Sequence, residues 1–253
     1  MKFYRRLAPF QAISFDLDDT LYSNYPVMMA TDAKMVAYFS ALFSLQTIAT
    51  HATKNTLFDY QFWSPFREQA IAANPQLIHH VGDIRLATYT LGMKALGLAD
   101  DIASDQAQKA LDYFVQQRSD FVVPEAVHQL LQSLQKKYPL VAISNGNVDT
   151  DKIGISAYFS YRFHAGDLST TALNKNQRLR QKPAADMFVE ACEKLIIEPS
   201  QLLHVGDCGR SDILGAIDAG CQTAWISCYD VGKPLTVLPN IELADISELC
   251  HLL

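Results

Sequence analysis

The chain has 253 residues, of which 49% are hydrophobic and 19% charged, and its formal net charge is −6. This length allows one large domain or two small ones. The acidic balance, without a basic run or alternating basic and aromatic residues, argues against a nucleic-acid partner. None of its five cysteines forms a Cys-x-x-Cys pair, which disfavours a disulfide framework and a structural zinc site.

The N-terminal residues are briefly basic, but Gln11 interrupts their apolar stretch and Asp16 ends it, so a signal peptide is not expected. No apolar run approaches the roughly 20 residues that a membrane helix needs. An odd number of cysteines without a pairing pattern fits a reducing compartment. We therefore expect a soluble, cytoplasmic protein without a membrane partner.

Residues 12–15 form a short apolar run that predicts a buried β-strand, and Asp16, Asp18 and Thr20 follow it. Ligands of open α/β sheets bind outside the carboxyl ends of the strands. Two carboxylates there could hold a metal, attack an electrophile or transfer a proton. An acidic turn is also common without any function, because Asp satisfies turn backbone groups. This segment alone leaves both interpretations open.

Helical periodicity then continues from residue 23 to residue 121. The apolar positions of the first predicted helix, residues 31–45, share one face: Met35, Val36, Phe39, Leu42 and Phe43. Further helices are predicted at residues 59–73, 83–96 and 105–118. We expect the second of these four helices to be interrupted near Pro65. The block reads as an inserted helical cap domain.

From residue 122 onward, strand and helix patterns alternate. Strands are predicted at residues 140–146, 161–166, 202–207 and 223–227. Helices are predicted after Pro124, after Pro183 and at residues 211–219. Such alternation is typical of a parallel sheet that is covered on both faces. The sequence therefore predicts a Rossmann-like α/β core, formed by residues 1–22 and 122–253, with an α-helical cap at 23–121.

Polar residues of particular types follow the predicted strands: Asp16 and Asp18, Ser144 and Asn145, Lys182 after a long loop, and Asp207 with Asp212. The carboxyl ends of parallel strands lie along one edge of the sheet, so these groups can converge. Singly, three of them have ordinary explanations: Ser144 as a turn residue, Lys182 as an exposed lysine at a helix start, and Asp212 as a first-turn charge. Their combination and order favour a catalytic site.

The residue types fit phosphoryl transfer. Asp16 could attack phosphorus to give an aspartyl phosphate. A hard cation is then needed between the anions, and Mg²⁺ could be held by Asp16, Asp207 and a backbone carbonyl near Asp18. Lys182 and Ser144 could bind phosphate oxygens. Asp18 would act as acid and base, because crowding and partial burial raise the pKa of a carboxyl group.

These segments resemble the four motifs of the haloacid dehalogenase-like (HAD) superfamily: FDLDDT, ISNG, Lys182-Pro183 and GDCGRSD. The resemblance implies a Rossmann-like core with a mobile helical cap. It implies Asp16 as nucleophile and Asp18 as acid/base. It also implies phosphate binding by Ser144 and Lys182, to which we add Asn145, and Mg²⁺ held by Asp16, Asp18 and Asp207. We place Asp212 behind these ligands.

More narrowly, the chain resembles the bacterial flavin-pathway phosphatases of this superfamily. The resemblance rests on MKFYRRL ahead of ISFDLDDTLYSN, on PLVAISNGN, and on LLHVGD followed by AGCQTAWI. It implies a small phosphorylated metabolite as partner: 5-amino-6-(5-phospho-D-ribitylamino)uracil or FMN, in riboflavin biosynthesis. Two features depart from the pattern. Cys208 stands where many relatives have a second acid, and residues 167–181 form a longer loop that includes Lys175.

Several alternatives stay open. A phosphatase for another metabolite, such as a sugar phosphate or phosphoglycolate, or a phosphomutase would share every motif. A dehalogenase of the superfamily usually lacks the acid at Asp18. A receiver-like phospho-Asp signalling module would be about half as long and would lack both the helical insert and Asp212. A non-catalytic binding protein would be expected to have lost Asp16 or Asp18.

Overall fold

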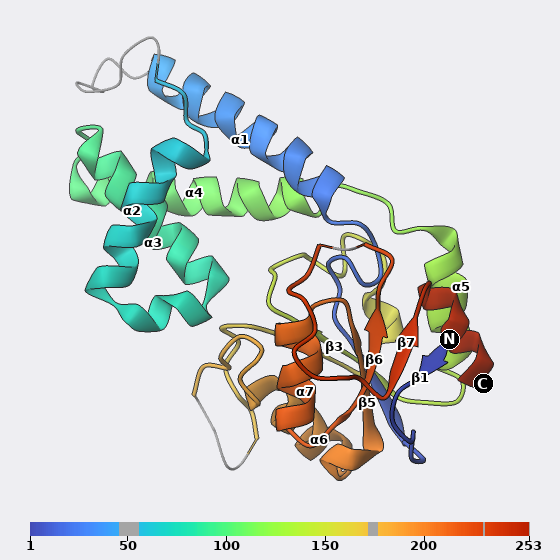
Figure 1. Cartoon of the computed structure of the whole chain (residues 1–253). Helices are drawn as coiled ribbons and strands as arrows, with labels where there is room; N and C mark the ends of the chain where they lie inside the picture. Colours follow the sequence, from blue (N-terminus) through green and yellow to red (C-terminus); the bar gives the residue numbers. More distant parts are fainter. Residues whose placement is uncertain (46–55, 172–176, 230, 253) are drawn as a thin grey trace. The chain divides into compact units, whose positions relative to one another are not determined.

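The computed structural model describes residues 1–45, 56–171, 177–229 and 231–252. The chain divides into two compact units, Met1–Asn24 with Phe121–Leu253, and Tyr25–Asp120 (Figure 1). The boundaries expected from sequence follow residues 22 and 121. Among the helices in the described ranges, none is both long and apolar enough to cross a membrane.

The first unit is built on a seven-stranded sheet with the order β1-β7-β6-β5-β2-β3-β4. Its strands are β1 (Lys2–Phe3), β2 (Ala12–Phe15), β3 (Leu140–Ser144), β4 (Tyr161–His164), β5 (Leu202–Gly206), β6 (Gln222–Ile226) and β7 (Ile241–Leu243). Only the β1–β7 pair is antiparallel. The predicted α/β fold class is confirmed. The sequence analysis missed β1 and β7, because strands of two or three residues carry too short a pattern.

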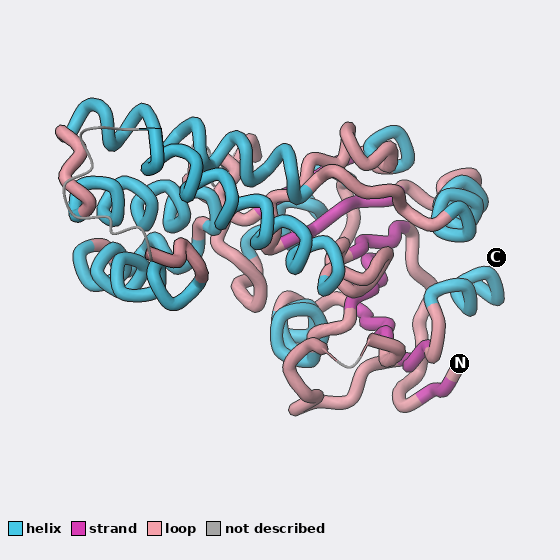
Figure 2. Tube along the Cα trace, turned by 90° about the horizontal axis from the view of Figure 1, so that it is seen from above, coloured by secondary structure: helices cyan, strands magenta, loops and turns pink. Residues whose placement is uncertain are grey.

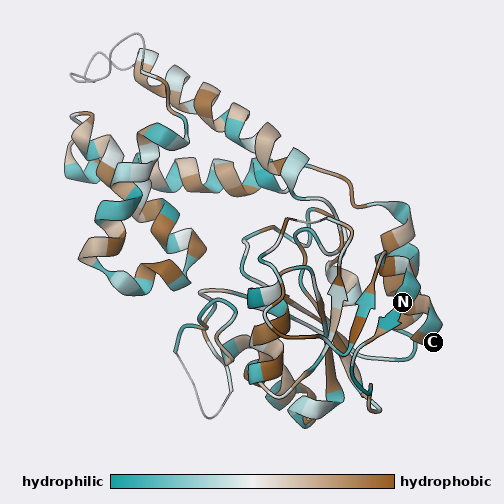
Figure 3. Ribbon diagram, viewed as in Figure 1, coloured by the Kyte–Doolittle hydropathy of each residue, from teal (hydrophilic) through white to brown (hydrophobic). Residues whose placement is uncertain are grey.

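Strand β2 lies in the interior of this sheet, where it pairs in parallel with β3 on one side and β5 on the other. All four of its residues are buried, as expected for a parallel strand covered on both faces. The central strands are accordingly hydrophobic (Figure 3). The carboxyl end of β2 thus lies beside those of β3 and β5, at the point where the strand order changes direction.

Helices cover both faces of the sheet (Figure 2). Ile13 and Phe15 of β2 pack in one apolar cluster with α5 (Glu125–Leu134). Ala12 packs in a second cluster with α6 (Asp186–Leu195). This division follows from the alternation of side chains along a strand.

The helix expected at residues 211–219 differs from the prediction. A π-helical turn, Gly209–Leu214, comes first, and a short helix α7 (Gly215–Asp218) follows. In the turn, the backbone N–H groups of Asp212 and Ile213 both donate to the Cys208 carbonyl, at 2.9 and 3.2 Å. Such widened turns often occur at functional sites. Here the turn carries Asp212.

The second unit contains four α-helices in its described ranges, α1 (Tyr25–Leu45), α2 (Tyr60–Ala73), α3 (Val81–Ala95) and α4 (Asp100–Arg118), and a short 3₁₀ helix, Pro75–His79. The predicted interruption near Pro65 is wrong, because α2 runs through it. Pro65 removes one helical hydrogen bond. Asp59 caps the helix by accepting from the Phe62 N–H at 3.1 Å. Buried Trp63 and Ala70 anchor the helix to its neighbours.

The long loop before Lys182 is held at its base by Glu190 of α6. This buried carboxylate accepts hydrogen bonds from the Ser169, Thr170 and Thr171 hydroxyls and from the Thr170 N–H. Burial alone would raise the pKa of Glu190, but these hydrogen bonds outweigh it and lower the pKa. Lys175, noted in the sequence, lies outside the described residues.

Candidate active site

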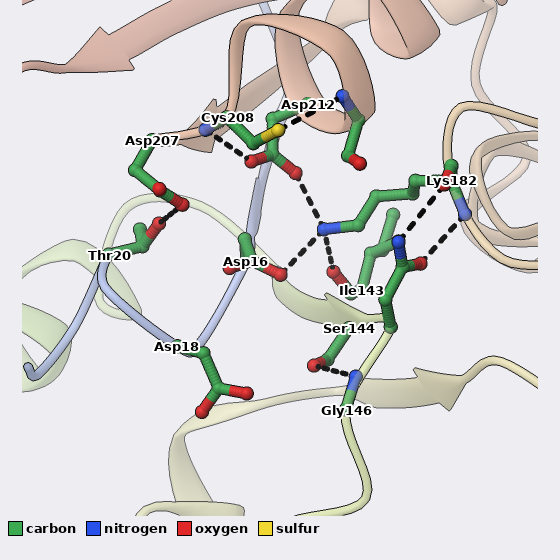
Figure 4. Close-up of polar contacts among 12 residues, drawn as sticks. Asp16, Asp18, Thr20, Ile143, Ser144, Gly146, Lys182, Asp207, Cys208 and Asp212 are labelled. Carbon is green, nitrogen blue, oxygen red and sulfur yellow. Dashed lines mark hydrogen bonds and ion pairs between the residues drawn. The ribbon is translucent and has the colours of Figure 1, made fainter. Parts of the chain in front are cut away.

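The ammonium group of Lys182 lies at the centre of the converging strand ends (Figure 4). Its Nζ donates to Asp16 Oδ1 at 2.6 Å and to Asp212 Oδ1 at 2.7 Å. It also donates to the Ile143 carbonyl at 2.7 Å. The side chain is only 1% exposed, so Lys182 is not the surface lysine at a helix start that a single residue would suggest.

The charges of this cluster stabilise one another. Burial disfavours the ammonium form, yet Asp16 and Asp212 raise the pKa of Lys182 above its ordinary value. Burial also disfavours the Asp212 carboxylate, but Lys182 outweighs it and holds the pKa of Asp212 far below its usual range. For Asp16 burial prevails over Lys182, and its pKa is raised. One ammonium is thus shared between two buried carboxylates.

A third carboxylate, that of Asp207, follows β5. Asp16, Asp207 and Asp212 each place a carboxylate oxygen within 4.8 Å of the others. Burial, with repulsion from Asp212 and Asp16, raises the pKa of Asp207 to about 8. A crowded all-oxygen set with excess negative charge fits a hard divalent cation. Both oxygens of Asp212 already accept hydrogen bonds, from Lys182 and from the Cys208 N–H, so Asp16 and Asp207 are the better candidates for metal ligands.

Asp18 lies apart from this cluster. Its carboxylate points away from Lys182 and Asp212 in Figure 4. Oδ1 accepts a hydrogen bond from the Tyr22 hydroxyl at 2.9 Å. Tyr22 is 3% exposed and packs against Phe121, with ring centroids 4.6 Å apart. No partner for Asp18 was expected from the sequence; in the structure the Tyr22 hydroxyl orients its carboxylate.

Ser144 and Asn145 follow β3 on the same edge of the sheet. The Ser144 hydroxyl accepts from the Gly146 N–H at 3.0 Å. The Asn145 amide bonds the backbone of Lys182 on both sides: Oδ1 accepts from its N–H at 2.7 Å, and Nδ2 donates to its carbonyl at 3.0 Å. Asn145 therefore holds Lys182 in place. Phosphate binding by Ser144 and Asn145 stays a prediction.

His204 is a buried site residue that the sequence analysis missed. It lies on β5 opposite Ser14 of β2, and both are 0% exposed. His204 Nδ1 lies 2.9 Å from Ser14 Oγ, and Nε2 lies 3.3 Å from Asp212 Oδ1. Because Asp212 is an acceptor, Nε2 carries the proton and Nδ1 accepts from Ser14. Burial lowers the pKa of His204, so the ring is neutral. A polar residue within the apolar run LLHVG was the available signal.

Close backbone approach shapes the end of β5. A Cβ atom at Gly206 would lie 2.3 Å from Asp212 Cγ, so a side chain there would displace the carboxylate that pairs with Lys182. Cys208 completes the turn: its Sγ accepts from the N–H groups of Ser211 and Lys233, at 3.4 and 3.3 Å. The thiol is thus used as a backbone acceptor.

Comparisons with known proteins agree with this geometry. A family model for haloacid dehalogenase-like hydrolases matches residues 10–220. The 5-amino-6-(5-phospho-D-ribitylamino)uracil phosphatase YigB of Escherichia coli K12 is 32% identical over 257 residues, covering 100% of both chains. The N-acylneuraminate-9-phosphatase of Rattus norvegicus is 31% identical over 134 residues, or 51% of each chain.

One solved structure shares the fold over nearly the whole chain. A 2-haloacid dehalogenase from Pseudomonas syringae pv. Tomato DC3000 superposes with a TM-score of 0.82. It covers 96% of this chain and 97% of its own, at 23% sequence identity. At this identity the likeness concerns the fold and carries no statement about the reaction.

The central role of Lys182 can be tested by stability. Lys182→Met, measured by urea unfolding in EDTA, should lower the free energy of unfolding by about 3–5 kcal/mol, because Asp16 and Asp212 lose their shared counter-charge. The double variant Lys182→Met/Asp212→Asn should recover part of this loss. Lys194→Met, in the last turn of α6, is the control. Equal stability of wild type and Lys182→Met would contradict the ion-pair account.

Proposed function

Because this chain belongs to the haloacid dehalogenase-like hydrolases, we propose that it is a Mg²⁺-dependent phosphatase acting on 5-amino-6-(5-phospho-D-ribitylamino)uracil and FMN. The resemblance read from the motifs is confirmed, and so is the assignment as a phosphatase. The observation that carries the proposed mechanism is the fixed Asp16 carboxylate, held at 2.6 Å by a buried ammonium.

In the first step, Asp16 acts as the nucleophile. Its Oδ1 is held by Lys182, which leaves Oδ2 to attack phosphorus. The new bond joins Oδ2 to phosphorus, and the bond from phosphorus to the ester oxygen breaks. Protonated Asp18 gives its proton to the departing oxygen, so that an alcohol leaves. The Tyr22 hydroxyl donates to Asp18 Oδ1 and so orients the carboxyl group of the proposed acid.

In the second step, Asp18 acts as the base. It takes a proton from a water molecule whose oxygen attacks the phosphorus of the aspartyl phosphate. The bond between phosphorus and Asp16 breaks, inorganic phosphate leaves, and both carboxyl groups return to their starting states. Asp16 and Asp18 can have different roles because Lys182 binds Asp16, whereas Tyr22 binds Asp18.

Asp16, Asp207 and the backbone carbonyl of Asp18 would hold Mg²⁺. When bound, the ion supplies positive charge that favours the ionised carboxylates and allows an anionic phosphate to approach them. The three donors of Lys182 are already bonded to Asp16, Asp212 and the Ile143 carbonyl. Lys182 therefore contributes mainly by its charge and by orienting Asp16. A direct bond to phosphate would replace one of these three.

The substrate is proposed from the relative that matches the full length of the chain. The second candidate is a phosphatase for another small metabolite, favoured by the partial match to N-acylneuraminate-9-phosphatase. The Shigella boydii phosphoglycolate phosphatase, 24% identical over 253 residues, favours it as well. A cytoplasmic location belongs to this proposal and is supported by the five free cysteines.

Replacement of the nucleophile tests the mechanism. Asp16→Asn should keep the fold and lower kcat by about 10⁴ or more, because a neutral amide cannot form the acyl phosphate. Steady-state turnover of FMN and of p-nitrophenyl phosphate measures the loss, with circular dichroism as the fold check. Asp218→Asn, an exposed position in α7, should behave like wild type. An Asp16→Asn variant that retains most of its activity would overturn the mechanism.

Removal of divalent cations tests the metal requirement. EDTA should abolish turnover, and added Mg²⁺ should restore it, whereas Ca²⁺ should substitute poorly because its coordination is longer and looser. Asp207→Ala should raise the Mg²⁺ concentration needed for half-maximal activity. Full activity of the wild type in metal-free buffer would rule out this part of the proposal.

A substrate panel tests the specificity. We expect kcat/KM for FMN and for the ribitylaminouracil phosphate to exceed the values for hexose phosphates, N-acylneuraminate 9-phosphate and phosphoglycolate. The reason is that contacts with the non-reacting ring can be used in the transition state. Preference for a sugar phosphate or phosphoglycolate would support the second candidate and leave the phosphatase chemistry unchanged.

A further inference from the structure

The helical unit contains a cavity of about 580 Å³ between α1, α2 and α3. Its walls include aromatic and methionine side chains, among them Phe39, Phe58, Trp63 and Met35. This volume is typical of sites for small organic molecules, which combine apolar walls with a few polar groups. Every lining residue belongs to the helical unit, so the cavity is a feature of that unit alone.

One wall of the cavity is fixed by close packing. Trp63 of α2 rests directly on α3 at Gly92, where an added Cβ would lie 2.5 Å from the Trp63 ring carbon Cζ3. The indole Nε1 donates to the Phe58 carbonyl at 3.2 Å. The packing therefore fixes the position of the Trp63 ring, and its only polar atom, Nε1, already has a hydrogen-bond acceptor. A preorganised aromatic wall favours a flat ligand, because little ordering remains to be done on binding.

Four charged residues line the same cavity, namely Asp32, Asp59, Arg67 and Arg85. Arg85 of α3 stacks on Phe114, with Cζ 3.5 Å from the ring centroid, and donates to the Tyr89 hydroxyl at 3.3 Å. Its Nε is buried and has no acceptor in the part of the chain that the structure describes. Asp32 of α1 is an exposed residue that also lines the cavity; partial burial of its carboxyl group raises its pKa, and the Arg85 charge opposes this. A cationic donor thus faces the cavity together with an acceptor.

We propose that this cavity binds a flat heteroaromatic ring whose edge carries a carbonyl next to an imide N–H, as in a pyrimidinedione. Arg85 would donate to the carbonyl, and Asp32 would accept from the N–H. The inference rests on the proposed function in that the uracil and flavin rings named there have this edge. It adds the residues that recognise it.

Other ligand classes fit the cavity less well. A hydrocarbon ring would leave the buried Arg85 Nε without an acceptor, which is costly. An anionic ligand would place like charge against Asp32. A cationic ligand would meet Arg85 and also Arg67, which lines the same cavity. A neutral ring with adjacent donor and acceptor groups satisfies both Arg85 and Asp32.

Phosphate-free flavins test this inference on the full chain. Lumiflavin carries the imide N–H, and 3-methyllumiflavin carries a methyl group in its place. Titration of wild type, followed by flavin fluorescence, should show lumiflavin binding about tenfold more tightly, the effect of one hydrogen bond to a charged group. Asp32→Ala should weaken lumiflavin binding by about the same factor and leave 3-methyllumiflavin nearly unchanged.

Two further variants complete the test. Arg85→Met should weaken both flavins, because the carbonyl loses its donor in each case. If the loss of the Arg85 stacking on Phe114 prevents folding, the comparison of Asp32→Ala with wild type decides the test, because Asp32 is exposed and its replacement should not disturb the fold. Asp105→Ala, an exposed acid of α4 outside the cavity, is the matched control and should bind as wild type does.

The outcomes separate this inference from the proposed function. If wild type prefers FMN in turnover but does not bind lumiflavin, or if Asp32→Ala and Asp105→Ala bind both flavins alike, the inference is overturned and the proposed function stands. If lumiflavin binds with the expected dependence on Asp32 while FMN is a poor substrate, the inference stands and the proposed function fails.

Discussion

The ion pairs of the buried Lys182 ammonium are the interaction on which the catalytic edge of the sheet depends. Its three partners come from the ends of β2 and β3 and from the turn after β5. Two carboxylates so close together in a dry site would repel each other strongly without a cation between them. The strand order that places β2 between β3 and β5 is therefore coupled to this one side chain: the sheet brings the anions together, and Lys182 makes their proximity stable.

Hydrogen bonds from neighbouring groups fix the position of Lys182. Asn145 binds its backbone on both sides, and Asp212 connects it to the Cys208 N–H and to neutral His204. The Asp18 carboxylate accepts a hydrogen bond from the Tyr22 hydroxyl and is not bonded to Lys182 in the contacts described above. In the proposed mechanism, this difference in environment allows Asp16 to act as the nucleophile and Asp18 as the acid and base.

The two units divide the recognition that the proposed reaction needs. The site in the α/β unit offers carboxylates and the Lys182 ammonium. These groups suit phosphate and a metal and do not distinguish one esterified alcohol from another. The helical unit has its own aromatic core and a cavity with a donor and an acceptor. A phosphatase that must choose one metabolite among many phosphate esters can gain that choice in the helical unit without altering the chemistry.

Sequence alone determined the α/β class, the helical insertion and the chemical types at the strand ends, because apolar periodicity and the residues that follow each strand are local properties. Asp16, Asp18, Lys182 and Asp207 could be found in this way. Only the tertiary structure decided what depends on pairing between distant segments. His204 meets Ser14 because of the register between β2 and β5, and Asn145 meets Lys182 because the loop before Lys182 returns to the end of β3. Helix α2 continues through Pro65 because packing outweighs local propensity.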